Sequence, residues 1–298
     1  MITQELKERA LGAYLGFACG DALGATVEFM TPSQIQQRYG LHQDIIGGGW
    51  LALKAGQVTD DTQMSLALGA AILEQQGWQL TAVAEHFLTW LDSDPPDIGN
   101  TCKRGLLRYR ATGELCDPIR KDSAGNGACM RNLPVVLATL WHADDFIEWS
   151  LQQSHITHNN PLSDAATLCL GQMTQHLIQG CTLTETLSLS AQLIANHPEF
   201  NYHPYPGKSS AYIVDTVQTV LHAIENTDNF ESCLLKTVNQ GGDADTTGAL
   251  AGMLAGAHYG VSQIPERWLA ALDQSITTQI QQQSLELLQL AKSFSIQK

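Results

Sequence analysis

The chain has 298 residues, of which 44% are hydrophobic, and its 30 Asp and Glu outnumber 16 Lys and Arg, so the formal net charge is -14. This length allows a large core, and the composition is that of a globular protein. Because so acidic a surface repels polyanions, we expect no nucleic-acid partner. A phosphate-containing ligand would need local positive charge, from metal ions or from N–H groups at helix starts.

The 7 cysteines are scattered and never spaced as C-x-x-C, which indicates free thiols in a reducing compartment. The first residues lack the basic start and unbroken apolar stretch of a signal peptide. No apolar run reaches the length of a membrane span. We therefore expect a cytoplasmic protein.

Nearly every segment has the apolar periodicity of an amphipathic helix, and sustained strand-like alternation is absent. In chain order, the clearest periodic segments are residues 80–91, 161–180, 209–224 and 274–294. Thr31 and Pro32 predict a helix start, and Gly180 and Gly260 predict helix ends. We expect an all-α protein that forms a single domain over residues 1–298, because no Pro/Gly/Ser-rich linker interrupts the chain.

Two glycine ladders have a four-residue step: Gly12, Gly16, Gly20 and Gly24, then Gly248, Gly252 and Gly256. This step aligns glycines along one side of a helix, where a neighbouring backbone can approach closely. The flanking acidic residues argue against a membrane dimer motif. The first ladder leads into Asp21 and Glu28, and the second begins just after Asp243. Close packing of two such helices would bring these acidic residues together.

Two acidic clusters precede helical runs: Thr59, Asp60, Asp61 and Thr62, and then Asp243, Asp245 and Thr246 after two glycines. Carboxylates and hydroxyls are hard oxygen ligands that suit Mg²⁺ or Mn²⁺, and two facing clusters could hold a metal pair. Asp and Thr also cap helices, but one side chain suffices for a cap. Several like charges packed together are costly unless a cation neutralises them. We therefore favour metal binding, in a hydrolase, over capping alone.

Three further segments carry polar residues: DPPDIGN at 94–100, KDSAGNGACMR at 121–131 and THNNP at 157–161. Taken singly, each is typical of a turn, a loop or a helix cap. Together they supply a glycine loop able to approach a phosphate, a carboxylate for acid or nucleophilic work, and a histidine for polar recognition.

In this order, the motifs resemble the ADP-ribosylglycohydrolase family: GDALGATVE at 20–28, TDDT at 59–62, GNGACMR at 125–131, TH at 157–158 and GGDADTTGALAGMLAG at 241–256. The resemblance implies a compact orthogonal helical bundle with two Mn²⁺ or Mg²⁺ ions. It implies these metal ligands: Thr59, Asp60, Asp61, Asp243, Asp245 and Thr246. Asp97 is the first choice for proton transfer at the ribose, and Glu28 is the second. The residues expected to contact substrate are Gly99, Asn100, Ser123, Gly125, Asn126, Gly127, His142 and His158.

Within the family, the settings of Asp97, His142 and His158 resemble the branch that acts on nitrogenase iron protein. The implied reaction removes ADP-ribose from an arginine of dinitrogenase reductase. The implied partners are a PII-type signalling protein and an ammonium transporter, which would recruit the protein peripherally to the membrane. Three alternatives stay open: a hydrolase of ADP-ribosyl serine or of a free ADP-ribose derivative, a two-metal diphosphatase, and a non-catalytic ADP-ribose-binding protein.

Overall fold

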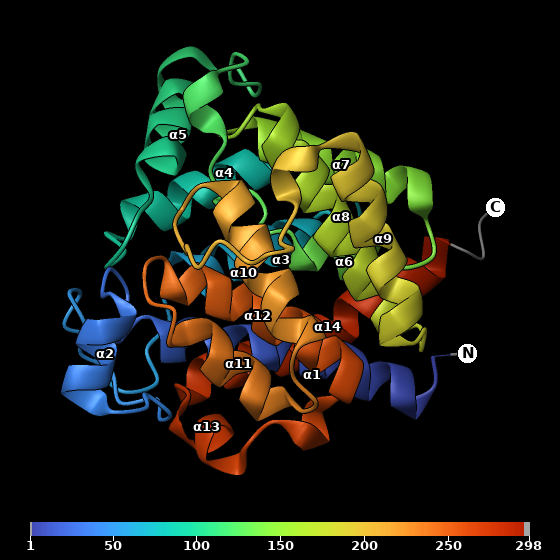
Figure 1. Ribbon diagram of the computed structural model, residues 1–298. Helices are drawn as coiled ribbons and strands as arrows, with labels where there is room; N and C mark the ends of the chain where they lie inside the picture. Colours follow the sequence, from blue (N-terminus) through green and yellow to red (C-terminus); the bar gives the residue numbers. More distant parts are fainter. Residues whose placement is uncertain (1, 295–298) are drawn as a thin grey trace.

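All regular secondary structure in the computed structural model, which describes residues 2–294, is helical (Figure 1). The α-helices are α1 (Gln4–Gly24), α2 (Pro32–Tyr39), α3 (Asp60–Glu74), α4 (Leu80–Asp92), α5 (Asn100–Thr112), α6 (Leu133–Ala138), α7 (Ala143–His155), α8 (Pro161–Ile178), α9 (Leu183–Asn196), α10 (Ile213–Glu225), α11 (Phe230–Val238), α12 (Ala244–Tyr259), α13 (Glu266–Ala271) and α14 (Gln274–Phe294). Short 3₁₀ helices are η1 (Lys121–Ser123), η2 (Pro198–Phe200) and η3 (Val261–Gln263). The all-α prediction is confirmed.

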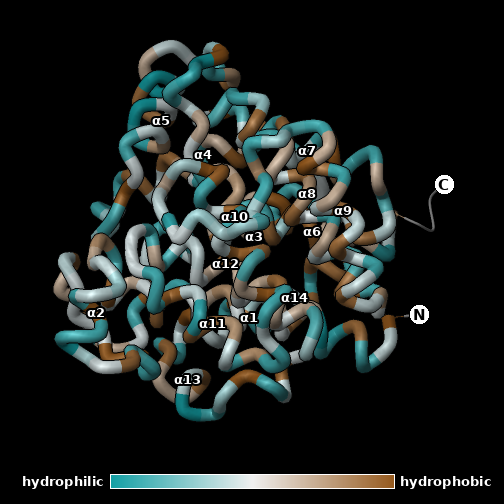
Figure 2. Tube along the Cα trace, in the orientation of Figure 1, coloured by the Kyte–Doolittle hydropathy of each residue, from teal (hydrophilic) through white to brown (hydrophobic). Residues whose placement is uncertain are grey.

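The four periodic segments predicted from the sequence correspond to α4, α8, α10 and α14. Helix α10 begins later than predicted because the residues before it pair with a distant segment. Ile213 donates its backbone N–H to the carbonyl of Ala124 at 3.0 Å, and Asn126 donates to Ala211 at 3.1 Å. In Figure 2 the helices alternate between hydrophilic and hydrophobic positions, as amphipathic helices do.

The glycine ladders pack against each other, as predicted, and join α1 to α12 in antiparallel orientation near the centre of the bundle (Figure 1). Gly12 lies against Gly256, Gly16 against Gly252 and Gly20 against Gly248. A Cβ atom on any of these glycines would collide with main-chain atoms of the facing helix. The end of α1 therefore meets the beginning of α12, where the second acidic cluster lies.

The predicted helix boundaries are also confirmed. Thr31 caps α2 in a capping box with Pro32 at the first turn. Gly180 and Gly260, just beyond α8 and α12, have φ values of 92° and 81°. Among residues 2–294, no helix combines the length and apolar character needed to cross a membrane.

Candidate active site

The two acidic clusters meet where α1 ends and where α3 and α12 begin. The Thr246 hydroxyl donates to Oδ2 of Asp61 at 3.2 Å, although the two residues are 185 positions apart in the chain. Glu28 lies just beyond α1 and contributes a third segment to the same place. Backbone contact between α1 and α12 thus places the carboxylates of three segments together.

The cluster residues at the helix starts do not act as helix caps. Thr59 and Asp243 occupy the N-cap positions of α3 and α12, but neither side chain makes a capping hydrogen bond. The carboxylate of Asp21, on α1, caps α3 instead. It accepts hydrogen bonds from Thr59 N at 3.0 Å, Thr62 N at 3.1 Å and Thr62 Oγ1 at 2.6 Å. The local sequence around residue 60 gives no sign of this partner, because Asp21 lies on another helix.

Seven carboxyl groups gather at this site: Asp21, Glu28, Asp60, Asp61, Asp97, Asp243 and Asp245. None of them forms an ion pair with a Lys, Arg or His among the described residues. Burial, reinforced by neighbouring carboxylates, raises the pKa of Glu28 and Asp60 to about 8. Burial also raises the pKa of Asp243 to about 6. The like charges are therefore destabilising without a cation.

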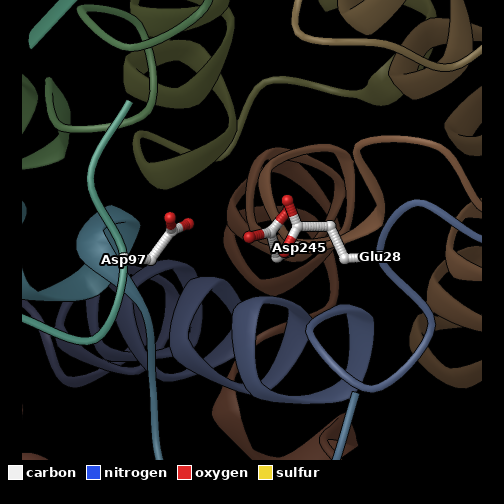
Figure 3. Close-up of side chains that lie close together, drawn as sticks. All are labelled: Glu28, Asp97 and Asp245. Carbon is white, nitrogen blue, oxygen red and sulfur yellow. The ribbon is translucent and has the colours of Figure 1, made fainter. Parts of the chain in front are cut away.

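The donor set fits a divalent cation. Oδ1 of Asp61 is buried and has no hydrogen-bond partner in the described part of the chain. Oxygens of Glu28, Asp97 and Asp245 all lie within 4.8 Å of one another, with Asp97 reaching toward the other two from a separate segment (Figure 3). Oxygen-only clusters of this kind suit Mg²⁺ or Mn²⁺. Glu28 and Asp97 are therefore close enough to serve as ligands themselves, beyond the ligand set expected from the sequence.

A cavity of about 440 Å³ opens in front of these carboxylates. Most of the residues predicted for the site line it: Glu28, Asp60, Asp97, Gly99, Asn100, Gly125, Asn126, Gly127, His158, Asp243, Asp245 and Thr246. Thr59 and Asp61 are buried and do not line it. We call the side formed by Glu28, Asp60, Asp243, Asp245 and Thr246 the acidic wall.

Another part of the lining, which we call the amide wall, consists of Gly99 and Asn100 at the start of α5, residues 125–127, and His158. It touches the acidic wall, because the Gly99 N–H donates to Oδ2 of Asp60 at 3.3 Å. A Cβ atom at Gly125 would lie 3.1 Å from Nε2 of His158, and one at Gly127 would lie 2.8 Å from Cε1. The two glycines thus leave the room that the imidazole occupies. Asn126 connects the walls, because its amide donates to the Asp243 carboxylate and to Thr216 Oγ1 at 3.0 Å.

Two residues expected to contact substrate lie elsewhere. His142 precedes α7, and its Nε2 lies 2.9 Å from the carbonyl of Ala291 in α14, so its ring packs on the C-terminal helix and not in the cavity. Ser123 is buried behind the amide wall and accepts a hydrogen bond from Arg104 Nη2 at 2.9 Å. Its position supports the wall and does not line the cavity.

Two aromatic residues at the cavity were not predicted. Phe29 and Trp50 line the cavity, yet 64% and 54% of their surface is exposed, and their ring centroids are 5.3 Å apart. Trp50 Nε1 donates to Oε2 of Glu28 at 2.5 Å. Trp50 lies in a loop without periodicity, so only the contact with Glu28 shows its importance.

Comparison with known proteins identifies the family. The model of the ADP-ribosylglycohydrolase family matches residues 2–295. The chain belongs to the ADP-ribosylglycohydrolase family. This confirms the resemblance inferred from the motifs.

Relatives in this family match nearly the whole chain. The ADP-ribosyl-dinitrogen reductase glycohydrolase of Rhodospirillum rubrum is 55% identical over 291 residues, which cover 98% of this chain and 99% of that protein. The ADP-ribosylarginine hydrolase Tri1 of Serratia proteamaculans is 32% identical, over 91% of this chain and 76% of that protein. A solved structure described as an ADP-ribosylglycohydrolase-related protein complex has a TM-score of 0.84 at 32% identity, covering 97% of this chain and 100% of that one. The helical bundle is thus the fold of the family.

Proposed function

We propose that this protein is a hydrolase that uses two Mn²⁺ or Mg²⁺ ions to remove ADP-ribose from an ADP-ribosylated arginine of dinitrogenase reductase. The observation that carries the proposal is a buried cluster of carboxylates that form no ion pair with any cation of residues 2–294 and lie at a cavity of about 440 Å³. The name of the Rhodospirillum relative, 55% identical over 98% of this chain, supports the substrate. The name of the Tri1 relative supports the arginine linkage.

The proposed metal ligands are those expected from the sequence: Thr59, Asp60, Asp61, Asp243, Asp245 and Thr246. Glu28 and Asp97 join them as candidates because their oxygens lie within 4.8 Å of an Asp245 oxygen. When bound, the ions would supply concentrated positive charge that offsets these carboxylates and acts as a Lewis acid toward ligand oxygens.

We assign proton transfer to Asp97, which lies on the loop before α5. Oδ1 of Asp97 accepts its neighbour's N–H, from Ile98, at 2.8 Å, and this bond fixes the side chain while the carboxyl group remains half-buried at the cavity. In the proposed reaction, water adds to the anomeric carbon as the bond to the guanidinium nitrogen breaks. Asp97 accepts a proton from the water and passes it to the departing nitrogen, so that the protons balance. Glu28, held by Trp50, is the second candidate for this role.

The amide wall would bind the anionic part of the ligand through uncharged hydrogen-bond donors. Helix α5 begins at Asn100 and directs its first N–H groups to the cavity end where Gly99 and Asn100 lie. A helix start of this kind favours phosphate oxygens. The amide wall therefore suits the diphosphate, and the acidic wall suits the ribose and the scissile bond.

The decisive experiment measures release of ADP-ribose from ADP-ribosylated arginine by Asp97→Asn and Asp243→Asn variants. Both should lose at least about a hundredfold in rate, since each removes a group at the reacting centre. In a calorimetric titration with Mn²⁺, Asp97→Asn should lose less affinity than Asp243→Asn, because Asp97 is half-buried at the cavity while Asp243 belongs to the buried acidic cluster. Asp144→Asn, at an exposed position on α7, is the matched control. Undiminished turnover in either site variant would overturn the assignment.

Product and substrate identity separate the alternatives. Intact ADP-ribose as product indicates a glycohydrolase, and AMP indicates a diphosphatase. Release of ADP-ribose from ADP-ribosylated dinitrogenase reductase should be faster than its release from ADP-ribosylated serine peptides. Binding of ADP-ribose without turnover of any substrate would favour the non-catalytic alternative.

We also propose a cytoplasmic location, with recruitment to the membrane through a PII-type signalling protein and an ammonium transporter. The support is the resemblance to the branch of the family that acts on nitrogenase iron protein. Co-precipitation of this protein with each partner, before and after addition of ammonium, tests the proposal.

A further inference from the structure

Arg131 is a fully buried cation whose presence the proposed reaction does not explain. Among residues 2–294, no carboxylate forms an ion pair with it. Its guanidinium donates to Oε1 and O of Gln153, both at 2.8 Å, and to Oγ1 of Thr157 at 2.9 Å. It also lies over the Phe87 ring, 4.5 Å from the centroid. Burial lowers the pKa of Arg131, and the nearby Asp60 carboxylate offsets this effect only in part. A buried charge without an ion pair is costly, so a purely structural role is a weak explanation.

The Thr157 hydroxyl connects Arg131 to His158. Its Oγ1 lies 2.9 Å from Nη2 of Arg131 and 2.7 Å from Nδ1 of His158. Since a guanidinium only donates, Oγ1 accepts from Arg131, and the hydroxyl proton is free to go to an acceptor. The other neighbour of the hydroxyl is the thiol of Cys102, whose sulfur is a weak acceptor. The proton therefore goes to Nδ1, which leaves the imidazole proton on Nε2.

Nε2 of His158 lies at the amide wall, beside Gly125 and Gly127, and the ring lines the cavity. None of the described residues accepts a hydrogen bond from this nitrogen. Burial, together with the charges of Arg131 and Arg104, lowers the pKa of His158 well below its ordinary value, so the ring is neutral. A neutral ring with its proton on Nε2 presents one donor to the cavity.

We propose that Arg131 and Thr157 are positioning residues that keep the proton of His158 on Nε2, so that the ring donates a hydrogen bond to an acceptor oxygen of the bound ligand. The identity of that ligand, ADP-ribose, rests on the proposed function. The tautomer itself rests on the hydrogen bonds alone.

Nitrogen NMR of the protein labelled at histidine, in Mg²⁺ buffer near neutral pH, tests the tautomer directly. The His158 signals, assigned with a His158→Gln variant, should show a protonated Nε2 and an unprotonated Nδ1. Thr157→Val should convert this pattern to a mixture of tautomers, and Thr157→Ser should restore it. Thr174→Val is the matched control, because the Thr174 hydroxyl is also buried but bonds only within its own helix, to Leu170 O at 2.8 Å. A wild-type signal with the proton on Nδ1, or an unchanged tautomer in Thr157→Val, overturns the proposal.

Ligand binding gives the second readout. Thr157→Val should weaken binding of ADP-ribose and raise KM about tenfold, the expected loss of one hydrogen bond to a charged group, with little change in kcat. Thr157→Ser and Thr174→Val should bind as the wild type does. Equal loss of binding in Thr157→Ser would indicate a structural role and contradict the proposal. If the wild type neither binds nor releases ADP-ribose, the proposed function fails, while the NMR pattern still decides the tautomer.

Discussion

The acidic wall and the amide wall face the same cavity but are held by different interactions. The acidic wall is positioned by backbone contact between α1 and α12, where glycines on one helix touch main-chain atoms of the other. The amide wall is positioned by side-chain hydrogen bonds around a buried guanidinium, with Gln153 and Thr157 as its partners. One wall thus depends on close packing, and the other on a polar network.

The two walls also differ in how their polar groups are satisfied. Within residues 2–294, the like charges of the acidic wall form no ion pair with a cation, and Asp61 behind it has a buried oxygen that accepts no hydrogen bond. The amide wall contains neutral donors, and its supporting charge on Arg131 is fully hydrogen-bonded to neutral groups. The acidic wall therefore has the charge and the oxygen ligands that suit a divalent cation, whereas the amide wall does not. Under the proposed function, the acidic wall would bind the ribose and the amide wall the diphosphate, each by different chemistry.

The largest effect is expected where backbones touch. Gly252→Ala should lower the free energy of unfolding by about 3 kcal/mol or more, because the added methyl would collide with the Gly16 carbonyl. Gly99→Ala on the amide wall should cost less than about 1 kcal/mol, since its backbone is extended and nothing lies within 4 Å of the new methyl. Urea denaturation measures both. Similar losses in the two variants would show that the walls do not differ in packing.

The next effect concerns pH and metal. Burial raises the pKa of Asp21 and Asp243 to about 6 and of Glu28 and Asp60 to about 8. In the folded state these carboxyl groups keep their protons to a higher pH than in the unfolded state, where they ionise near pH 4. The free energy of unfolding that this protonation contributes is present at low pH and is lost as pH rises through 8. In EDTA, raising the pH from about 5.5 to about 8 should lower Tm by roughly 5 °C.

Addition of Mn²⁺ at pH 8 should restore stability. At a free Mn²⁺ concentration a hundred times Kd, it should raise the free energy of unfolding by about 2.7 kcal/mol. Asp245→Asn is the informative variant, because burial and neighbouring carboxylates raise the pKa of Asp245 well above its ordinary value. Asp245→Asn should reduce both the change of Tm with pH in EDTA and the increase of Tm on addition of Mn²⁺. A flat Tm between these pH values in EDTA would contradict the charge repulsion assigned to the acidic wall.

A moderate effect is expected where the walls join. Asn126→Asp places a carboxylate against Asp243 in place of the amide donor, and should cost the metal-free protein about 2 kcal/mol. Asn229→Asp adds the same charge at an exposed helix start, where the side-chain oxygen can still cap α11, so it should change stability by less than about 0.5 kcal/mol. Denaturation in EDTA compares them. Equal stability of the two variants would mean that the acidic wall tolerates further negative charge.

The sequence predicted those features whose physical cause is local. Helix α14 begins where its apolar periodicity does, at residue 274, and continues through residue 294, the last that the structure describes. The acidic clusters were recognisable because Asp and Thr concentrate beside helix starts, and the glycine step at positions 248 to 256 revealed a contact surface. Periodicity and residue type carry this information without knowledge of the fold.

The features that were missed all depend on contacts between distant segments. The carboxylate of Asp21 caps a helix 38 residues away, and its own surroundings show nothing of this. His142 and His158 are the same residue type beside a helix boundary, yet only His158 finds room between Gly125 and Gly127. Which histidine reaches the cavity is decided by packing across the bundle, which one-dimensional patterns do not encode.

The smallest expected effect separates the roles of two N-cap residues. Asn160 caps α8, with Oδ1 accepting from Leu162 N at 3.0 Å, and Asn160→Ala should cost about 1 kcal/mol in urea denaturation. Thr59 occupies the same position in α3 but makes no capping bond, so Thr59→Val should cost less than half as much in EDTA. It should instead weaken Mn²⁺ binding measured by calorimetry, whereas Asn160→Ala should not. If Thr59→Val is as destabilising as Asn160→Ala and leaves metal affinity unchanged, capping and not ligation explains the threonine, and the proposed metal site loses one of its ligands.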